Sequence, residues 1–133
     1  MSRLIVEING KKEFASKVVL CVETDDRPVS MVTFCPWRAK EWVLPWSRLD
    51  AVSFAHVEES EQLELFFPHH HIVAAGENLR KVLKDIDVFQ VCRLRDLPPS
   101  HRASFGPADP FITRLEVHLL ADPANRRPAN VPF

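Results

Sequence analysis

Apolar and polar residues alternate along several short segments of this chain, which is the pattern of half-buried β-strands. The alternation is clearest in 113–119, where every second residue is apolar. We expect the apolar residues of this segment to share a buried face and the polar residues to point outward, because successive side chains of a strand lie on opposite faces. The expected inner residues are Leu115, Val117 and Leu119, and the outer ones are Arg114, Glu116 and His118.

Three further segments follow one another closely enough to form a meander. The segments 51–57 and 62–67 are joined by a short acidic connection and predict a hairpin. Pro68 and His69 then turn the chain into a third strand at 70–75.

The strands expected before the meander rest on weaker patterns. The dipeptide Asn9-Gly10 is typical of tight hairpin turns and predicts a hairpin that joins 4–8 to 11–15. The run 18–22 is apolar on both faces, so we expect an interior strand there, with 29–34 as its partner.

One segment has the periodicity of an amphipathic helix. We expect a helix at about 77–87, because four apolar residues recur there at positions i, i+3, i+4 and i+7. Strand character resumes after it, at 88–94. The four residues of the expected buried stripe are Leu79, Val82, Leu83 and Ile86.

Together these elements predict an α+β fold, predominantly antiparallel, in which about eight strands form a small open barrel or roll around the helix. We expect residues 1–120 to form a single globular domain and 121–133, with its three prolines, to form an extended Pro-rich tail. The connection 98–110 is unusually long and predicts a lid or a brace. The segment from Pro36 to Pro45 is expected to contain tight turns rather than regular structure.

Composition changes this picture mainly by exclusion. The 133 residues are enough for one domain with a hydrophobic core, and the 17 basic and 18 acidic residues leave a formal charge of −1. A general nucleic-acid binder is usually more basic. The three glycines are too dispersed for a phosphate-binding loop, which excludes P-loop nucleotide hydrolysis.

The cysteines and the apolar runs bear on the compartment. The three cysteines form no C-x-x-C pair, and we expect them to be free thiols. No stretch approaches the length of about 20 apolar residues that a membrane-spanning helix needs, and the first residues do not resemble a secretory signal. We therefore expect a cytoplasmic protein that does not contact membranes.

Three adjacent histidines raise the possibility of a metal site. In a strand that begins at His69, the imidazoles of His69 and His71 would share one face and could bind zinc or another divalent transition metal. A third ligand would have to come from a distant histidine or carboxylate. The alternative is a polar hairpin turn that is rich in histidine and needs no cofactor.

A tryptophan-rich segment is the second candidate site. The residues expected to contact a partner are Trp37, Arg38, Trp42, Trp46 and Arg48. Exposed tryptophan and arginine side chains dominate many protein interfaces, and the same combination can stack on single-stranded nucleic acid. The alternative is that the indoles belong to the core.

No complete catalytic constellation is visible. Ser100, His101, Ser104 and Asp109 share one long loop, but none of the patterns that place a nucleophile beside its base is present. We therefore expect a non-catalytic binding or assembly module that contacts a protein partner, or a second copy of itself in a homo-oligomer, through the tryptophan segment. The alternatives are a metal-dependent hydrolase that uses His69 and His71, and a single-strand nucleic-acid binder.

Overall fold

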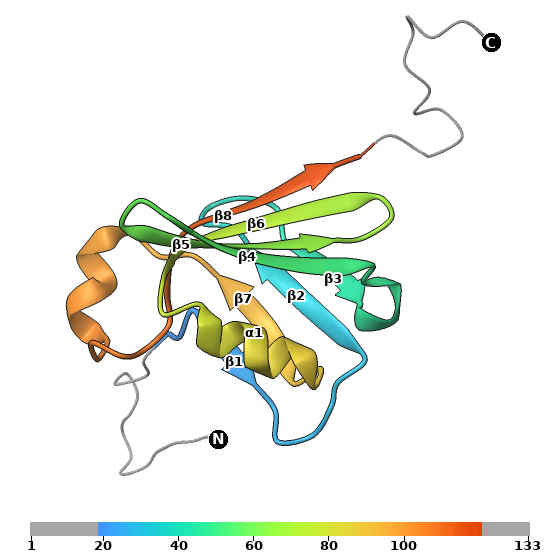
Figure 1. Ribbon diagram of the computed structural model, residues 1–133, viewed down its shortest axis with the longest axis horizontal. Helices are drawn as coiled ribbons and strands as arrows, with labels where there is room; N and C mark the ends of the chain where they lie inside the picture. The colour runs from blue at the N-terminus through green and yellow to red at the C-terminus, as the bar shows by residue number, and fades with distance from the viewer. Residues whose placement is uncertain (1–18, 121–133) are drawn as a thin grey trace, which may run out of the picture.

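The structure is a computed structural model that describes residues 19–120 (Figure 1). The hairpin predicted at 4–15 and the tail predicted at 121–133 lie outside these residues. The described part contains eight strands, one α-helix and two 3₁₀ helices. In chain order the elements are β1 (Val22–Thr24), β2 (Met31–Cys35), β3 (Trp42–Pro45), η2 (Trp46–Arg48), β4 (Ala51–Val57), β5 (Ser60–Phe66), β6 (His70–Glu77), α1 (Arg80–Asp87), β7 (Val91–Arg95), η3 (Pro99–Ser104) and β8 (Phe111–Leu119).

The strands form two four-stranded sheets. Sheet A has the order β1-β7-β2-β3 and sheet B has the order β4-β5-β6-β8. All pairs are antiparallel except β2 and β7, which run parallel. The predicted α+β class and its mainly antiparallel pairing are confirmed. Within residues 19–120 the sheets do not close into a barrel, and the strands form two sheets instead of the single open barrel or roll that we expected.

The two sheets share one hydrophobic core. Val32 and Phe34 of sheet A are fully buried, as are Leu63 and Ile72 of sheet B. Along β2 and β5 the buried residues alternate with less buried ones, so each sheet turns one apolar face toward the other. The meander of β4, β5 and β6 is confirmed, with a continuous register between β4 and β5.

The helix α1 lies on the inner side of the sheets, across β7 (Figure 1). Leu79, Val82 and Ile86 are buried, and Leu83 is partly buried, which confirms the predicted stripe. The helix begins at Arg80 and not at 77, because β6 continues through Glu77 and pairs there with Phe111. Asn78, with a φ of 61°, then turns the chain from the strand toward the helix.

The strand predicted at 18–22 is largely wrong. Val19 and Leu20 are each nearly half exposed, and β1 begins only at Val22. The sequence suggested β2 as its neighbour, but in the sheet β1 lies next to β7. A short apolar run does not reveal which distant strand it will pair with, and here the pairing joins segments about seventy residues apart, such as Val22 and Leu94.

Two other predictions also need correction. The segment between Pro36 and Pro45 contains the regular strand β3, which tolerates Pro45 because it is an edge strand of sheet A. In β8, Leu115 is buried but Leu119 is 64% exposed, because Leu119 pairs with His70 at the outer end of sheet B. No helix within residues 19–120 is long and apolar enough to cross a membrane.

Candidate functional site

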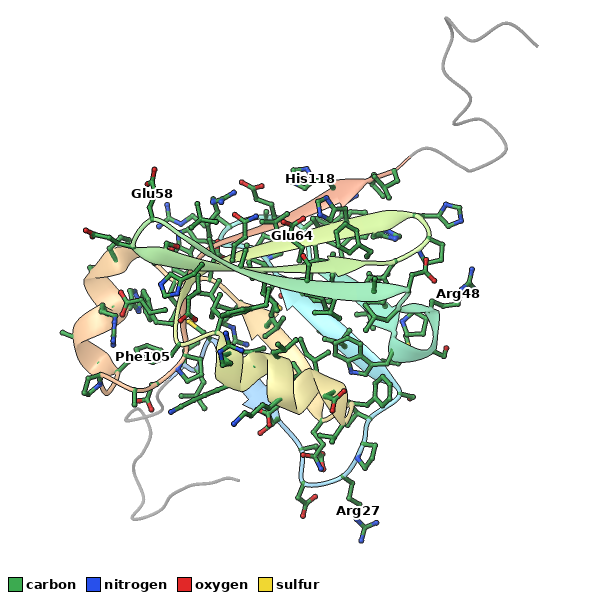
Figure 2. The ribbon with its side chains drawn as sticks, viewed as in Figure 1. Arg27, Arg48, Glu58, Glu64, Phe105 and His118 are labelled. Carbon is green, nitrogen blue, oxygen red and sulfur yellow. The ribbon has the colours of Figure 1, made fainter. Side chains whose placement is uncertain are left out.

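The parallel pair of strands creates the candidate site. Because β2 and β7 run in the same direction, Cys35 and Arg95 pair at their carboxyl ends, and the loops that follow leave the sheet side by side. These loops and η3 enclose a cleft of about 620 Å³, which we call the Trp37 cleft. The cleft is lined by Cys35, Trp37, Arg38, Glu41, Arg95, Asp96, His101 and Phe105, among others. Phe105 marks this side of the molecule in Figure 2.

Trp37 is the main exposed aromatic side chain of the cleft, with 44% of its surface accessible. Its ring meets the imidazole of His101 edge to face, with 6.0 Å between the centroids. The guanidinium of Arg38 lies 5.5 Å from the centroid of the same indole, within the range of a cation–π contact. The indole of Trp37 is therefore in contact with the imidazole of His101 and with the guanidinium of Arg38.

A buried carboxylate fixes the position of Trp37. Asp96 is only 9% exposed, and its two oxygens accept the backbone N–H groups of Trp37, at 2.6 Å, and of Leu115, at 2.9 Å. Hydrogen bonds to an ionised acceptor are among the stronger ones in proteins. The backbone at Trp37 is therefore tied to β8, and the exposed indole extends from a rigid support.

Two further polar groups of the cleft are Arg95 and Cys35. Arg95 donates to the carboxylate of Glu23 and to the carbonyl oxygen of Leu20, both at 2.8 Å. Burial, assisted by the charge of Glu41, raises the pKa of the Cys35 thiol, so this cysteine stays protonated at neutral pH. A protonated thiol is a poor nucleophile.

The serine, histidine and aspartate of the 98–110 loop do not form a catalytic arrangement. Asp109 accepts the backbone N–H of Gly106 at 2.7 Å, and His101 contacts the ring of Trp37. Within residues 19–120, no hydrogen bond joins His101 to either serine or to Asp109. The loop includes η3, and Arg102 joins it to the carboxylate of Glu77 at 3.0 Å.

The five residues of the predicted tryptophan surface do not lie on one surface. Trp37 and Arg38 line the cleft, whereas Trp42 is half-buried and packs against His70 at 5.1 Å. Trp46 belongs to the core: it is 3% exposed, and its indole N–H donates to the carbonyl oxygen of Val91. Arg48 is exposed at the other end of the molecule from Phe105 (Figure 2).

The histidines are also dispersed. His71 lies in β6 and binds the carboxylate of Glu64 at 2.8 Å, while its ring stacks on Phe66 with centroids 4.8 Å apart. His69 precedes the first residue of β6, so the expected alternation with His71 does not apply. Among residues 19–120, no group of three or more histidine, cysteine, aspartate or glutamate side chains is arranged to hold a metal ion. A zinc site at His69 and His71 therefore stays a prediction without a third ligand in the described part.

The outer face of sheet B instead carries a row of paired carboxylates and imidazoles. His71 lies opposite His118, and each contacts a glutamate: Glu64 in one case and Glu116 in the other. The hydrogen bond from His71 holds the pKa of Glu64 below its usual value, and the bond from Arg114 does the same for Glu116. Burial, with the nearby charge of His69, lowers the pKa of His70.

Sequence reasoning did not identify Arg95 and Asp96 as residues of a site. No local pattern indicates them, because they meet Trp37 only through the parallel pairing of β2 with β7. A charged pair at the carboxyl end of a strand was the available signal, since binding residues often lie at the carboxyl ends of strands. No protein-family model, curated protein or solved structure matches this chain. The geometry of the cleft is therefore the basis for the functional assignment.

Proposed function

We propose that this protein is a non-catalytic binding module that holds a protein partner in the Trp37 cleft. The observation that carries the proposal is the exposed indole of Trp37 on a backbone fixed by the buried carboxylate of Asp96. A side chain on a backbone that is already fixed loses less conformational freedom on binding than one on a mobile loop. Tryptophan and arginine are also the residue types that most often dominate interface energies.

The chemistry of the cleft favours a particular kind of peptide. Within residues 19–120, no hydrogen bond or ion pair engages the guanidinium of Arg38, so its donors are available to an acceptor. Trp37 offers apolar area beside it. We therefore expect a partner segment that places an apolar side chain against the indole and a carboxylate against Arg38.

A single-stranded nucleic acid fits the molecule less well. Stacking of successive bases needs several accessible rings in one groove. Trp46 is buried in the core and Trp42 packs against His70, which leaves Trp37 without a second indole nearby. The formal charge of −1 adds no general attraction for phosphates.

The proposal can be tested with a phage-displayed library of random peptides selected on the purified full chain. We expect enriched peptides whose affinity, measured by isothermal titration calorimetry, falls at least about tenfold for Trp37→Ala, which corresponds to about 1.4 kcal/mol. Arg38→Glu should weaken the same peptides, because it reverses the charge that receives their carboxylate.

Val43→Ala is the matched control, because Val43 is an apolar residue with 55% exposure that does not line the cleft. This variant should bind the peptides as the wild type does. Selected peptides that bind Trp37→Ala and the wild type equally would contradict the proposal, as would a selection that enriches no peptide. Circular dichroism should show that all three variants keep the wild-type fold.

A further inference from the structure

The free edge of β4 lacks the features that protect sheet edges. Edge strands in soluble proteins are usually short or carry charges, proline or bulges, which prevent pairing with other chains. β4 has seven residues, Ala51–Val57, with no lysine, arginine, aspartate, glutamate or proline and a continuous register with β5. Within residues 19–120, β5 is its only partner.

The other sheet edges of the described part are protected. The opposite edge of sheet B is β8, which carries Arg114 and Glu116 and has a register irregularity against β6 at Ala75/Gly76. In sheet A, β1 has only three residues, and β3 ends at Pro45. β4 is therefore the least protected of the sheet edges in residues 19–120.

An apolar groove runs beside this edge. A hollow of about 520 Å³ lies between β4 and α1 and is lined by Leu49, Val52, Leu83, Ile86 and Phe89, with Lys84 and Asp87 at its margin. Phe89 is 44% exposed, and Val57 at the end of β4 is 48% exposed. A strand added to β4 would cover apolar surface as well as backbone groups.

We propose that two copies of this chain associate through β4, antiparallel to each other, about a two-fold axis at Ser53. The four strands of sheet B in each copy would then form one continuous sheet. This inference is independent of the Trp37 cleft, which lies at the carboxyl ends of β2 and β7.

The sequence around β4 favours a second copy as the partner, because it is complementary to itself in this register. The symmetry places Ser53 opposite Ser53 and small residue opposite small residue at Ala51 and Ala55. Val52 meets Phe54, which extends the core across the junction, since both residues are partly buried against it. Leu49 meets the exposed Val57.

The charged and polar residues agree with the same register. Asp50 of one copy lies opposite His56 of the other, a carboxylate opposite an imidazole that can donate to it. At the ends of the strand, Arg48 of one copy approaches Glu58 of the other; Figure 2 shows these two residues at opposite ends of β4. Moving the axis to Phe54 would place Asp50 opposite Glu58, so like charges disfavour that alternative.

The first experiment measures the mass of the full chain in solution. At concentrations of tens of micromolar, light scattering coupled to size exclusion should give twice the 15.3 kDa of one chain. Ser53→Lys places two ammonium groups at the axis and should weaken association at least tenfold. Leu119→Lys is the control, because Leu119 is exposed on the opposite edge of sheet B, and this variant should remain dimeric.

A charge exchange tests the register. Asp50 and His56 are about 20 Å apart along one strand, so they can meet only between copies. Asp50→Lys and His56→Glu should each weaken the dimer several-fold, and the double variant should recover most of the loss. A monomeric wild type, dissociation by Leu119→Lys with no effect of Ser53→Lys, or a double variant no better than the single ones would overturn the proposal.

Discussion

The roles of several single residues follow from their contacts with segments that are distant in the sequence. Trp46, Asp96 and Gly76 all lie where two segments distant in sequence approach each other. Trp46 and Asp96 satisfy buried backbone groups of β7 and β8, at Val91 and Leu115, which would otherwise lack these hydrogen bonds. Gly76 allows a close approach: a Cβ at this position would overlap the carbonyl oxygen of Phe111 and lie 2.9 Å from the Cα of Ile112.

We therefore expect Gly76→Ala to lower the free energy of unfolding by about 1–3 kcal/mol, because backbone atoms of β8 must move to admit the methyl group. Urea denaturation followed by circular dichroism measures the change. Gly106→Ala is the control, since its Cβ would meet only the side chain of Asp109, at 3.1 Å, and a small shift of that exposed side chain relieves the contact. Equal losses for the two variants would contradict the steric explanation.

At the scale of elements, α1 shows how a neighbouring strand completes a helix. No side chain of the segment itself caps the helix, although Asn78 stands just before it. The backbone N–H of Leu79 instead donates to the carboxylate of Glu61 in β5, at 2.6 Å. The amide of Asn78 is occupied elsewhere, with the carbonyl oxygens of Pro107 and Asp109. A negative group near the first turn is also favourable for the helix dipole.

Removing this carboxylate should weaken the attachment of the helix. We expect Glu61→Ala to destabilise the protein by about 0.5–2 kcal/mol, the usual effect of losing a helix cap. Thermal unfolding measures the loss. Glu59→Ala, at an exposed position two residues earlier, should stay within about 0.5 kcal/mol of the wild type. If both variants behave alike, Glu61 has no capping role.

The elements recovered from the sequence are those with strong local patterns. The meander of β4, β5 and β6 and the stripe of α1 depend on side chains a few residues apart, so alternation and helical periodicity were sufficient. The pairing of β1 with β7 and of β7 with β2 was missed. These contacts join segments that are far apart along the chain, and a single sequence does not encode the register between them in any local pattern.

At the scale of the whole molecule, the outer face of sheet B makes stability dependent on pH. Glu64 and Glu116 have lowered pKa values in the folded protein because His71 and Arg114, respectively, are their strongest hydrogen-bond partners. A carboxyl group whose pKa is lower in the folded state contributes stability above its unfolded pKa, which is about 4.3 for glutamate. That contribution disappears as the pH falls through the folded pKa.

We expect the free energy of unfolding to decrease as the pH is lowered from 5 toward 3. The double variant Glu64→Gln with Glu116→Gln should decrease less steeply, because it lacks the two groups that take up protons on unfolding. Urea denaturation at several pH values measures both slopes. Glu59→Gln, in an exposed turn, should keep the wild-type slope. A double variant as acid-sensitive as the wild type would contradict this assignment.

The candidate site combines residues predicted from the sequence with a cleft that only the tertiary structure forms. Trp37 and Arg38 were predicted as contact residues from residue type alone, because tryptophan and arginine are enriched at protein interfaces. The segment predicted as one surface nevertheless includes Trp46 in the core and Arg48 at the far end of the molecule.

Alternation and helical spacing were enough to locate the central meander and the buried stripe of α1, since neighbouring residues carry those patterns. The Trp37 cleft and the unprotected edge of β4 were decided only by the order of the strands in the two sheets. Both depend on which distant segments the sheets bring together.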